Sequence, residues 1–243
     1  MKILLIGDIH GNLEALQSVL GEEKDVDKVV MTGDAIGYMA NPREVLDIVK
    51  NFDCILGNHD YTVLNPERLD WFNPVAKKAL VWTKKQLRKE DFVFLKELPF
   101  QRSYEEEGLT VVHGCLGVDP FEYLEMDFQA KENFELMKTN LLFLGHTHVP
   151  KVWQKDRNKD IWNLAKIEYN KEMFLDKSSK YIFNIGSVGQ PRDNDPRACY
   201  AIYDTEKYSI CYKRKKYDIG KTVQKIIENN LPRFLFERIV VGR

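Results

Sequence analysis

Short apolar runs alternate with amphipathic stretches over the first sixty positions. Three of these runs, at 2–6, 29–31 and 54–56, lead into Gly followed by Asp or Asn, directly or after one Thr. Such runs are typical of buried strands that end at a loop. The stretches that follow Asn12 and Asn41 carry apolar residues at helical spacing. The pattern therefore predicts an α/β start, with parallel strands joined by right-handed helical crossovers.

The rest of the chain divides into a helical part and a strand-rich part. Residues 61–107 are expected to be mostly helical, and Asn73 followed by Pro marks one helix start. Apolar runs typical of strands return after Gly108, and residues 220–230 predict a last helix. The lysine-rich stretch 154–180 is consistent with a projecting hairpin or with a mobile insertion. Because no low-complexity linker interrupts the chain, we expect residues 1–243 to form a single domain.

The composition is that of a globular protein, with 44% hydrophobic and 30% charged residues. A net charge of -1, from 36 basic and 37 acidic residues, provides no general basic field. We therefore expect no nucleic-acid partner and no membrane association. The apolar runs are too short to span a bilayer, and the N-terminus does not resemble a signal peptide. The four cysteines form no C-x-x-C pair, which indicates reduced thiols and a cytoplasmic location.

The five histidines all lie at the ends of predicted strands, and four of them are next to Gly, Asp or Asn. Asp8 and His10 are two positions apart, as are His146 and His148, so each pair points the same way in an extended segment. Carboxylates and imidazoles together favour Mn, Fe, Co, Ni or Zn over Ca or Mg. The carboxyl ends of parallel strands meet at one edge of a sheet, where ligands bind. The sequence therefore predicts a transition-metal site at that edge.

The order of these motifs resembles that of the calcineurin-like metallophosphoesterases. The matching segments are Asp8-Ile9-His10-Gly11-Asn12, Gly33-Asp34, Gly57-Asn58-His59-Asp60, His113-Gly114 and Gly145-His146-Thr147-His148. Residues 184–192 also resemble the small bacterial and archaeal phosphodiesterase branch, and the resemblance runs from residue 1 to about residue 212. It implies a four-layer α/β/β/α sandwich of two mixed sheets flanked by helices. The hydrophobic pattern alone predicts only an α/β chain.

The resemblance further implies two divalent transition-metal ions, with manganese favoured and iron, nickel, cobalt or zinc as alternatives. Two groups of three side chains would each hold one ion, and a carboxylate would bridge the ions. These are Asp8, His10 and His148 for the first ion, Asn58, His113 and His146 for the second, and Asp34 for the bridge. A hydroxide that bridges the ions would then attack the phosphorus in line.

Four further residues are candidates for catalysis or substrate binding. His59 adjoins a proposed ligand, and we expect it to protonate the leaving group, with Asp60 as the partner that orients it. The alternative for His59 is a hydrogen bond to a metal ligand. Asn12 is either a substrate contact or only a helix cap. Arg192 lies on a Gly-rich turn, where it either contacts a phosphate or has only a structural role in the turn.

Together the motifs predict a dinuclear metal-dependent phosphoesterase. A phosphodiesterase that acts on a small phosphorylated substrate is favoured, and a nucleotide is one candidate. A protein phosphatase and a dinucleoside polyphosphate hydrolase are alternatives. A non-catalytic scaffold with the same fold is a further alternative, which the intact ligand set disfavours. A mononuclear hydrolase or a metal-binding regulator is another alternative. Homo-oligomer formation stays open, because Trp71, Phe72 and Trp82 suit an interface and a core equally well.

Overall fold

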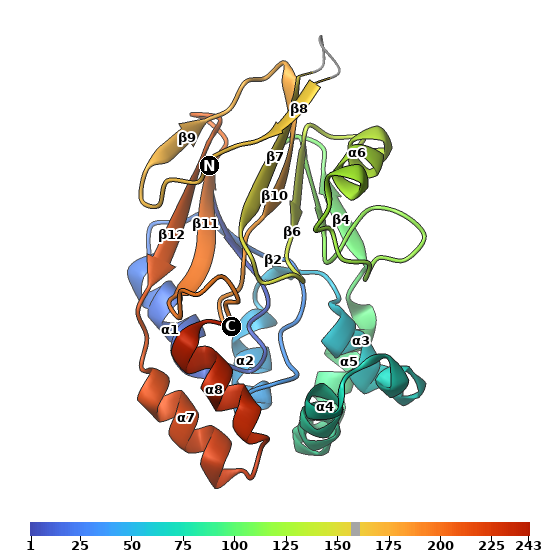
Figure 1. Cartoon of the computed structure of the whole chain (residues 1–243), viewed down its shortest axis with the longest axis vertical. Helices are drawn as coiled ribbons and strands as arrows, with labels where there is room; N and C mark the ends of the chain where they lie inside the picture. Colours follow the sequence, from blue (N-terminus) through green and yellow to red (C-terminus); the bar gives the residue numbers. More distant parts are fainter. Residues whose placement is uncertain (157–160) are drawn as a thin grey trace.

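The computed structural model describes residues 1–156 and 161–243, and it contains two six-stranded sheets (Figure 1). The first sheet has the order β3-β2-β1-β11-β12-β9 and the second the order β4-β5-β6-β10-β7-β8. The strands of the first sheet are β1 (Lys2–Ile6), β2 (Lys28–Met31), β3 (Asp53–Cys54), β9 (Glu172–Phe174), β11 (Ala198–Asp204) and β12 (Ser209–Lys215). Those of the second are β4 (Gln101–Tyr104), β5 (Leu109–Val112), β6 (Leu141–Leu144), β7 (Lys151–Asp156), β8 (Ile161–Leu164) and β10 (Ser179–Asn184). Both sheets combine parallel and antiparallel pairs, as predicted.

The predicted strand and helix order of the first sixty residues is confirmed. β1, β2 and β3 are parallel, and the helices α1 (Leu13–Glu22) and α2 (Pro42–Val49) connect them. β11 continues the sheet on the other side of β1 and runs antiparallel to it. The loops after β1, β2 and β3 therefore leave the sheet at one edge.

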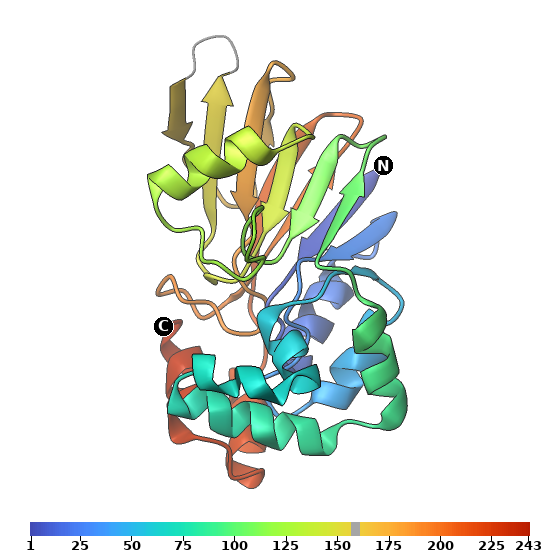
Figure 2. The ribbon, with the colours of Figure 1, turned by 90° about the vertical axis from the view of Figure 1, so that its right-hand side faces the viewer.

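The four-layer arrangement is visible along β1, whose side chains are buried on both faces of the first sheet. Leu4 and Ile6 belong to the core beneath α1 and α2, whereas Ile3 and Leu5 belong to the core between the two sheets. On the far side, α6 (Asp127–Leu136) covers the outer face of the second sheet (Figure 2). Burial on both faces explains the continuous apolar run in the sequence. The predicted α/β/β/α sandwich is confirmed.

The segment 61–107 is helical for most of its length but ends in a strand. It contains most of α3 (Asn58–Leu64), then the 3₁₀ helix η1 (Pro66–Trp71), α4 (Pro74–Gln86) and α5 (Lys89–Glu97). β4 then pairs antiparallel with β5, which corrects the helical expectation for its four residues. Arg102 and Tyr104 alternate with two exposed residues, and both contact the Asp53 carboxylate at 3.1 Å. This alternation has the period of a strand.

The stretch 154–180 adds an edge strand to each sheet. β7 and β8 form an antiparallel hairpin at the edge of the second sheet, as one of the two alternatives predicted. The connection at 157–160 lies outside the described residues. β9 pairs with β12 at the edge of the first sheet. The chain between 161 and 178 therefore passes from one sheet to the other.

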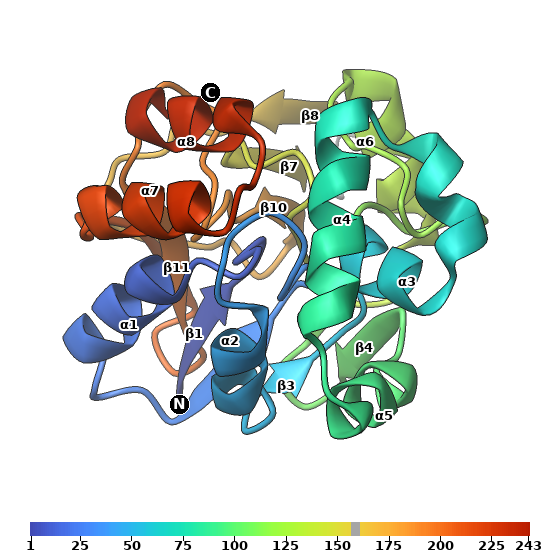
Figure 3. The same cartoon turned by 90° about the horizontal axis from the view of Figure 1, so that it is seen from below.

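Two helices at the end of the chain lie side by side (Figure 3). α7 (Ile219–Glu228) corresponds to the predicted last helix, whereas α8 (Arg233–Val241) was not predicted. Leu235 and Ile239 of α8 are buried in a cluster that includes Tyr38 and Met39 from the loop after β2. α8 is thereby fixed against this loop. None of the helices in the described part of the chain is both long and apolar enough to cross a membrane.

Candidate metal centre

The predicted metal ligands come together on loops that follow strands of both sheets. Asp8 and His10 follow β1, Asp34 follows β2, Asn58 begins α3 beyond β3, His113 follows β5, and His146 and His148 follow β6. Several of these residues have a left-handed backbone. The φ angles are 51° at Asp8, 52° at His10, 57° at Asp34, 66° at His146 and 62° at His148. Such conformations cost energy in non-glycine residues and cluster at functional sites.

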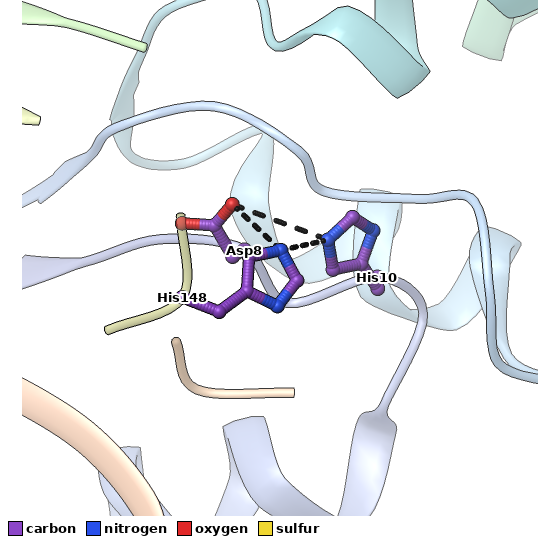
Figure 4. A group of neighbouring side chains, drawn as sticks. All are labelled: Asp8, His10 and His148. Atoms are coloured by element: carbon purple, nitrogen blue, oxygen red, sulfur yellow. Dashed lines mark hydrogen bonds and ion pairs between the residues drawn. The ribbon is translucent and has the colours of Figure 1, made fainter. Parts of the chain in front are cut away.

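The first group of ligands consists of Asp8, His10 and His148, which point toward one another (Figure 4). The Nε2 atoms of His10 and His148 are 3.0 Å apart, and Asp8 Oδ1 lies 3.3 Å from His148 Nε2. The Nδ1 atoms face the carbonyl oxygens of Ile36, at 3.2 Å for His10, and of Gln190, at 2.6 Å for His148. Each Nδ1 therefore carries the proton, and the Nε2 lone pairs converge with the carboxylate. This arrangement suits a cation.

The second group consists of Asp34, His113 and His146, with Asn58 beside them. His113 Nδ1 donates to the carbonyl of Thr32 at 2.8 Å, which leaves Nε2 as the coordinating nitrogen. This Nε2 lies 3.0 Å from Asn58 Oδ1 and 3.4 Å from Asp34 Oδ2. His146 Nε2 is buried and has no hydrogen-bond partner among residues 1–156 and 161–243. A second cation would satisfy this buried nitrogen.

The carboxylate of Asp34 lies between the two groups. Its Oδ2 atom is 3.6 Å from His10 Nε2 and 3.4 Å from His113 Nε2. Its Oδ1 atom accepts a hydrogen bond of 2.9 Å from the backbone N–H of His59, in the first turn of α3. The positive end of the helix thus stabilises the carboxylate. Asp34 is placed to contact ions in both groups.

The protonation states of most of these side chains agree with metal binding. The exception is His113, where burial opposes the charge but the nearby Asp34 carboxylate raises the pKa to about 9. Burial lowers the pKa of His10, His146 and His148 well below the usual value, so these imidazoles are neutral ligands. Burial raises the pKa of Asp8 to about 7, because a buried carboxylate is costly without a compensating cation. Burial also opposes the charge of Asp34, but the surrounding imidazoles hold its pKa well below the usual range. The buried set of nitrogen and oxygen donors fits a pair of borderline divalent ions.

His59 is buried on the cavity side of the two groups. One of its ring nitrogens lies within 4.8 Å of ligand atoms of His10 and Asp34. The ring packs on those of His10 and Tyr38 with centroid distances of 4.6 and 4.4 Å. A Cβ at Gly37 would stand only 2.3 Å from His59 Nδ1, so the glycine makes room for the imidazole. Burial lowers the pKa of His59 to about 4.

Asp60 does not orient His59. Its carboxylate accepts backbone hydrogen bonds from Ala35, Ile36 and Gly57, each at 3.2 Å. Both oxygens are therefore occupied in tying the start of α3 to the loop after β2. The expected pairing of the two side chains is corrected, because the carboxylate is held by these three backbone groups while His59 Nδ1 has no hydrogen-bond partner among the described residues.

We expect Asp60→Asn to destabilise the protein. The asparagine NH₂ group would face at least one of the three backbone donors, so a buried N–H would lose its acceptor. The expected loss in the free energy of unfolding is about 1–3 kcal/mol. Urea denaturation of metal-stripped protein at pH 8 measures it. Asp70→Asn is the matched control, because that side chain is 90% exposed, and its effect should be below about 0.5 kcal/mol. Equal stability of the two variants would contradict the anchoring role.

The structure separates the two candidate substrate contacts. Asn12 is buried, and its Oδ1 caps α1 by accepting from Ala15 N at 3.2 Å. Its Nδ2 donates to the carbonyl of Gly189 at 2.8 Å. Asn12 therefore has the alternative role of a helix cap and does not line the cavity beside the metal ligands. Arg192 does line it.

This cavity, of about 280 Å³, gives access to the ligands. Its walls include Asp34, Asn58, His59, His146 and His148, together with Tyr38, Tyr123, Arg192 and Arg238. Sequence reasoning missed Tyr123, whose ring stacks on His146 at a centroid distance of 3.9 Å, and Arg238 of α8. Neither belongs to a motif. For Arg238 the available signal was the spacing of Leu235 and Ile239, which marks a buried helix face beside it.

Residues 1–208 match the family model of the calcineurin-like phosphoesterase superfamily domain. The chain belongs to this superfamily. It is a metallophosphoesterase, a member of a family of phosphoric ester hydrolases, and its clusters of buried histidine and aspartate ligands are intact. The resemblance inferred from the motifs is thereby confirmed. The family implies a phosphoester substrate.

The metallophosphoesterase is similar over its full length to proteins of bacteria and archaea. It is 38% identical to the uncharacterized protein MJ0912 of Methanocaldococcus jannaschii, over 99% of this chain and 98% of that protein. It is 36% identical to a metallophosphoesterase of Sphaerobacter thermophilus, with a TM-score of 0.88, over 100% of this chain and 99% of the other. The hypothetical protein PH1004 of Pyrococcus horikoshii OT3 shares the fold, with 19% identity, a TM-score of 0.79 and coverage of 100% and 98%.

Proposed function

We propose that this protein is a dinuclear metal-dependent phosphodiesterase. The position of Asp34 supports the proposal most strongly, because one carboxylate oxygen lies 3.6 Å from His10 Nε2 and 3.4 Å from His113 Nε2. Two divalent ions held there would supply an activated water and positive charge for the phosphate oxygens. Asp8, His10 and His148 would hold one ion, and Asn58, His113 and His146 the other. We propose manganese as the native metal, and the same donors suit iron, cobalt, nickel and zinc.

We propose His59 as the general acid. It faces the cavity beside Asp34 and His10, with which it forms a third group of possible ligands, and each of the other two groups offers three donors without it. A phosphate anion bound against His59 would favour its protonated form. The imidazolium would then donate its proton to the leaving oxygen as the phosphorus–oxygen bond breaks. Asp60 has no part in this transfer, because its carboxylate is occupied by backbone N–H groups.

An aromatic groove beside the metal centre supports an organic group as part of the substrate. The groove, of about 570 Å³, is lined by residues that include Tyr61, Arg68, Trp71, Phe100 and Phe121. Four of these five also border the cavity of the metal centre, so the two spaces are adjacent. The rings of Tyr61, Phe100 and Phe121 lie 5.4–5.8 Å from one another. Such a surface suits a planar ring, and we propose a nucleotide-like ester as the substrate.

Trp71→Ala is expected to weaken the binding of a nucleotide substrate. Its side chain borders both spaces and carries the Arg68 guanidinium 3.9 Å from its ring centroid. Loss of stacking should raise KM for a nucleoside 5′-(p-nitrophenyl phosphate) about 5- to 30-fold, at about 1–2 kcal/mol for one stacked base. KM for methyl p-nitrophenyl phosphate should change less than twofold. Phe174→Ala, an exposed aromatic residue on β9, is the control. An equal rise in KM for both esters would contradict the groove's role.

The reaction itself is tested with bis-p-nitrophenyl phosphate and p-nitrophenyl phosphate on metal-stripped protein that is refilled with Mn, Ni, Co or Mg. We expect metal-dependent turnover of both esters, with the higher kcat/KM for the diester. A preference for the monoester would favour a phosphatase. Two bound metals per chain without turnover of either ester would favour a non-catalytic scaffold, and full activity with one metal per chain would favour a mononuclear hydrolase.

A further inference from the structure

Three arginines line the cavity of the metal centre, and none of them pairs with a carboxylate among the described residues. Arg68 packs on the ring of Trp71, whereas Arg192 and Arg238 both contact Gln190. Across residues 1–156 and 161–243, the side-chain hydrogen bonds of Arg192 go to Gln190, Tyr38 and Tyr123, and that of Arg238 goes to Gln190. The Nε atom of Arg238 is buried and has no partner among these residues. By contrast, Arg88, Arg197 and Arg214 each pair with an aspartate. Unneutralised guanidinium groups beside a cavity indicate an anion site.

The protein holds the guanidiniums of Arg192 and Arg238 close to each other. Gln190 Oε1 accepts from Arg192 Nη2 at 2.9 Å and from Arg238 Nη1 at 3.3 Å. The Tyr38 hydroxyl lies 3.4 Å from Arg192 Nη2, and its ring packs against Leu235 and Ile239 of α8. Burial and the nearby guanidinium of Arg192 lower the pKa of Arg238, as expected for two like charges held together. The helix is thus positioned to bring a second cation to this wall of the cavity.

The two arginines could bind either the phosphate under attack or another group of the ligand, and the number of oxygens in a diester substrate distinguishes these roles. A phosphodiester has two non-bridging oxygens, and a two-metal centre engages both sides of the attacked phosphate. Few acceptor sites then remain on that phosphate for two guanidiniums, each of which carries five N–H donors. A separate phosphate group offers three terminal oxygens to such a pair. The donor count therefore favours a ligand group other than the phosphate under attack.

We propose that Arg192 and Arg238 bind a second phosphate group of the substrate. This inference rests on the proposed phosphodiesterase function and narrows its substrate to phosphodiesters or phosphoanhydrides that carry a further phosphate. It assigns a binding role to α8, which lies beyond residues 1–208 that match the family model. The second phosphate is either a phosphomonoester elsewhere on a nucleoside or part of a polyphosphate chain.

The test compares two substrates with the same scissile bond, thymidine 5′-(p-nitrophenyl phosphate) and its 3′-phosphorylated form. We expect the metal-loaded protein to show about 10- to 100-fold higher kcat/KM with the 3′-phosphate, since a charge-assisted hydrogen bond is worth about 1.5–3 kcal/mol. Arg238→Gln should lower kcat/KM for the 3′-phosphorylated ester about tenfold more than for the unphosphorylated ester, so that the advantage is lost. Arg238→Lys should retain part of the advantage. A parallel assay with diadenosine tetraphosphate shows whether a polyphosphate chain is the preferred source of the second phosphate.

Arg233→Gln is the matched control, because this arginine lies on the same helix, is 81% exposed and pairs with Glu237. It should leave the discrimination unchanged. An equal loss of kcat/KM for both thymidine esters in Arg238→Gln would overturn the proposal. It would also be overturned if the wild-type protein hydrolysed both esters at the same rate and cleaved diadenosine tetraphosphate no faster than Arg238→Gln does.

A binding measurement separates this proposal from the proposed reaction. Calorimetric titration of metal-stripped protein with thymidine 3′,5′-bisphosphate should show about tenfold weaker binding to Arg238→Gln than to wild type and Arg233→Gln. If this binding difference is found but no ester is hydrolysed, the phosphodiesterase function is refuted and the phosphate site stands. Equal binding to all three proteins would refute the phosphate site.

Discussion

Asp34→Asn is expected to lower kcat/KM for bis-p-nitrophenyl phosphate by on the order of 10³-fold or more. Removal of a single electrostatic donor from an active site costs about 10²- to 10³-fold, and this substitution removes the charge shared by two metal groups. Asp34 Oδ2 lies 3.6 Å from His10 Nε2 and 3.4 Å from His113 Nε2. An amide there offers one neutral oxygen in place of the carboxylate. We expect the metal content per chain to fall as well.

The control for this prediction is again Asp70→Asn, which makes the same chemical change at an exposed position. Both variants should be refilled with manganese under the same conditions, and their metal content should be measured by mass spectrometry. Activity within tenfold of wild type in Asp34→Asn, with two metals per chain, would show that Asp34 does not bridge the ions.

His59→Ala should give the second-largest effect, and its size should depend on the leaving group. A positioned general acid contributes about 10²- to 10⁴-fold. We expect a loss of this size for diesters of alkyl alcohols, whose leaving oxygen needs a proton. For p-nitrophenyl esters the loss should be below about tenfold, because p-nitrophenolate leaves without one. Rates across a series of leaving groups measure this dependence.

Metal content distinguishes the roles left open for His59. A general acid that is no ligand leaves two metals per chain after its removal. A loss that is equal for all leaving groups would point to a role in holding a metal ligand. Loss of one metal would place His59 among the ligands, where one of its nitrogens already lies within 4.8 Å of ligand atoms of His10 and Asp34.

The metal ligands could be predicted from the sequence because their positions follow from topology. Asp8 comes two residues and Asp34 three residues after the end of a short strand, and parallel strands bring such residues to one edge of a sheet. The Asp-x-His and His-x-His spacings then identified the chemistry. The assignment to two ions came from the resemblance to a family and not from the pattern itself. The left-handed backbone at Asp8, His10 and Asp34 was not predictable, because residue type at these positions gives no signal for it.

Other parts of the site depend on tertiary contacts whose partners the local sequence does not identify, even where, as in α8, the spacing of apolar residues marks a buried helix face. Asp60 follows His59 in the chain, yet its carboxylate contacts backbone N–H groups of a loop more than twenty positions earlier. Arg238 reaches the cavity because α8 buries Leu235 and Ile239 against the loop after β2. The short strand β4 was missed because its neighbours are helical and its pairing with β5 is set by a turn. Local patterns cannot report such packing.

The most direct test of the account is anomalous X-ray diffraction at the manganese absorption edge from crystals grown with manganese. We expect two peaks, one on each side of the Asp34 carboxylate. One should lie within coordination distance of Asp8, His10 and His148, and the other within that of Asn58, His113 and His146. A single peak, or peaks that do not share Asp34 as a ligand, would contradict the dinuclear centre.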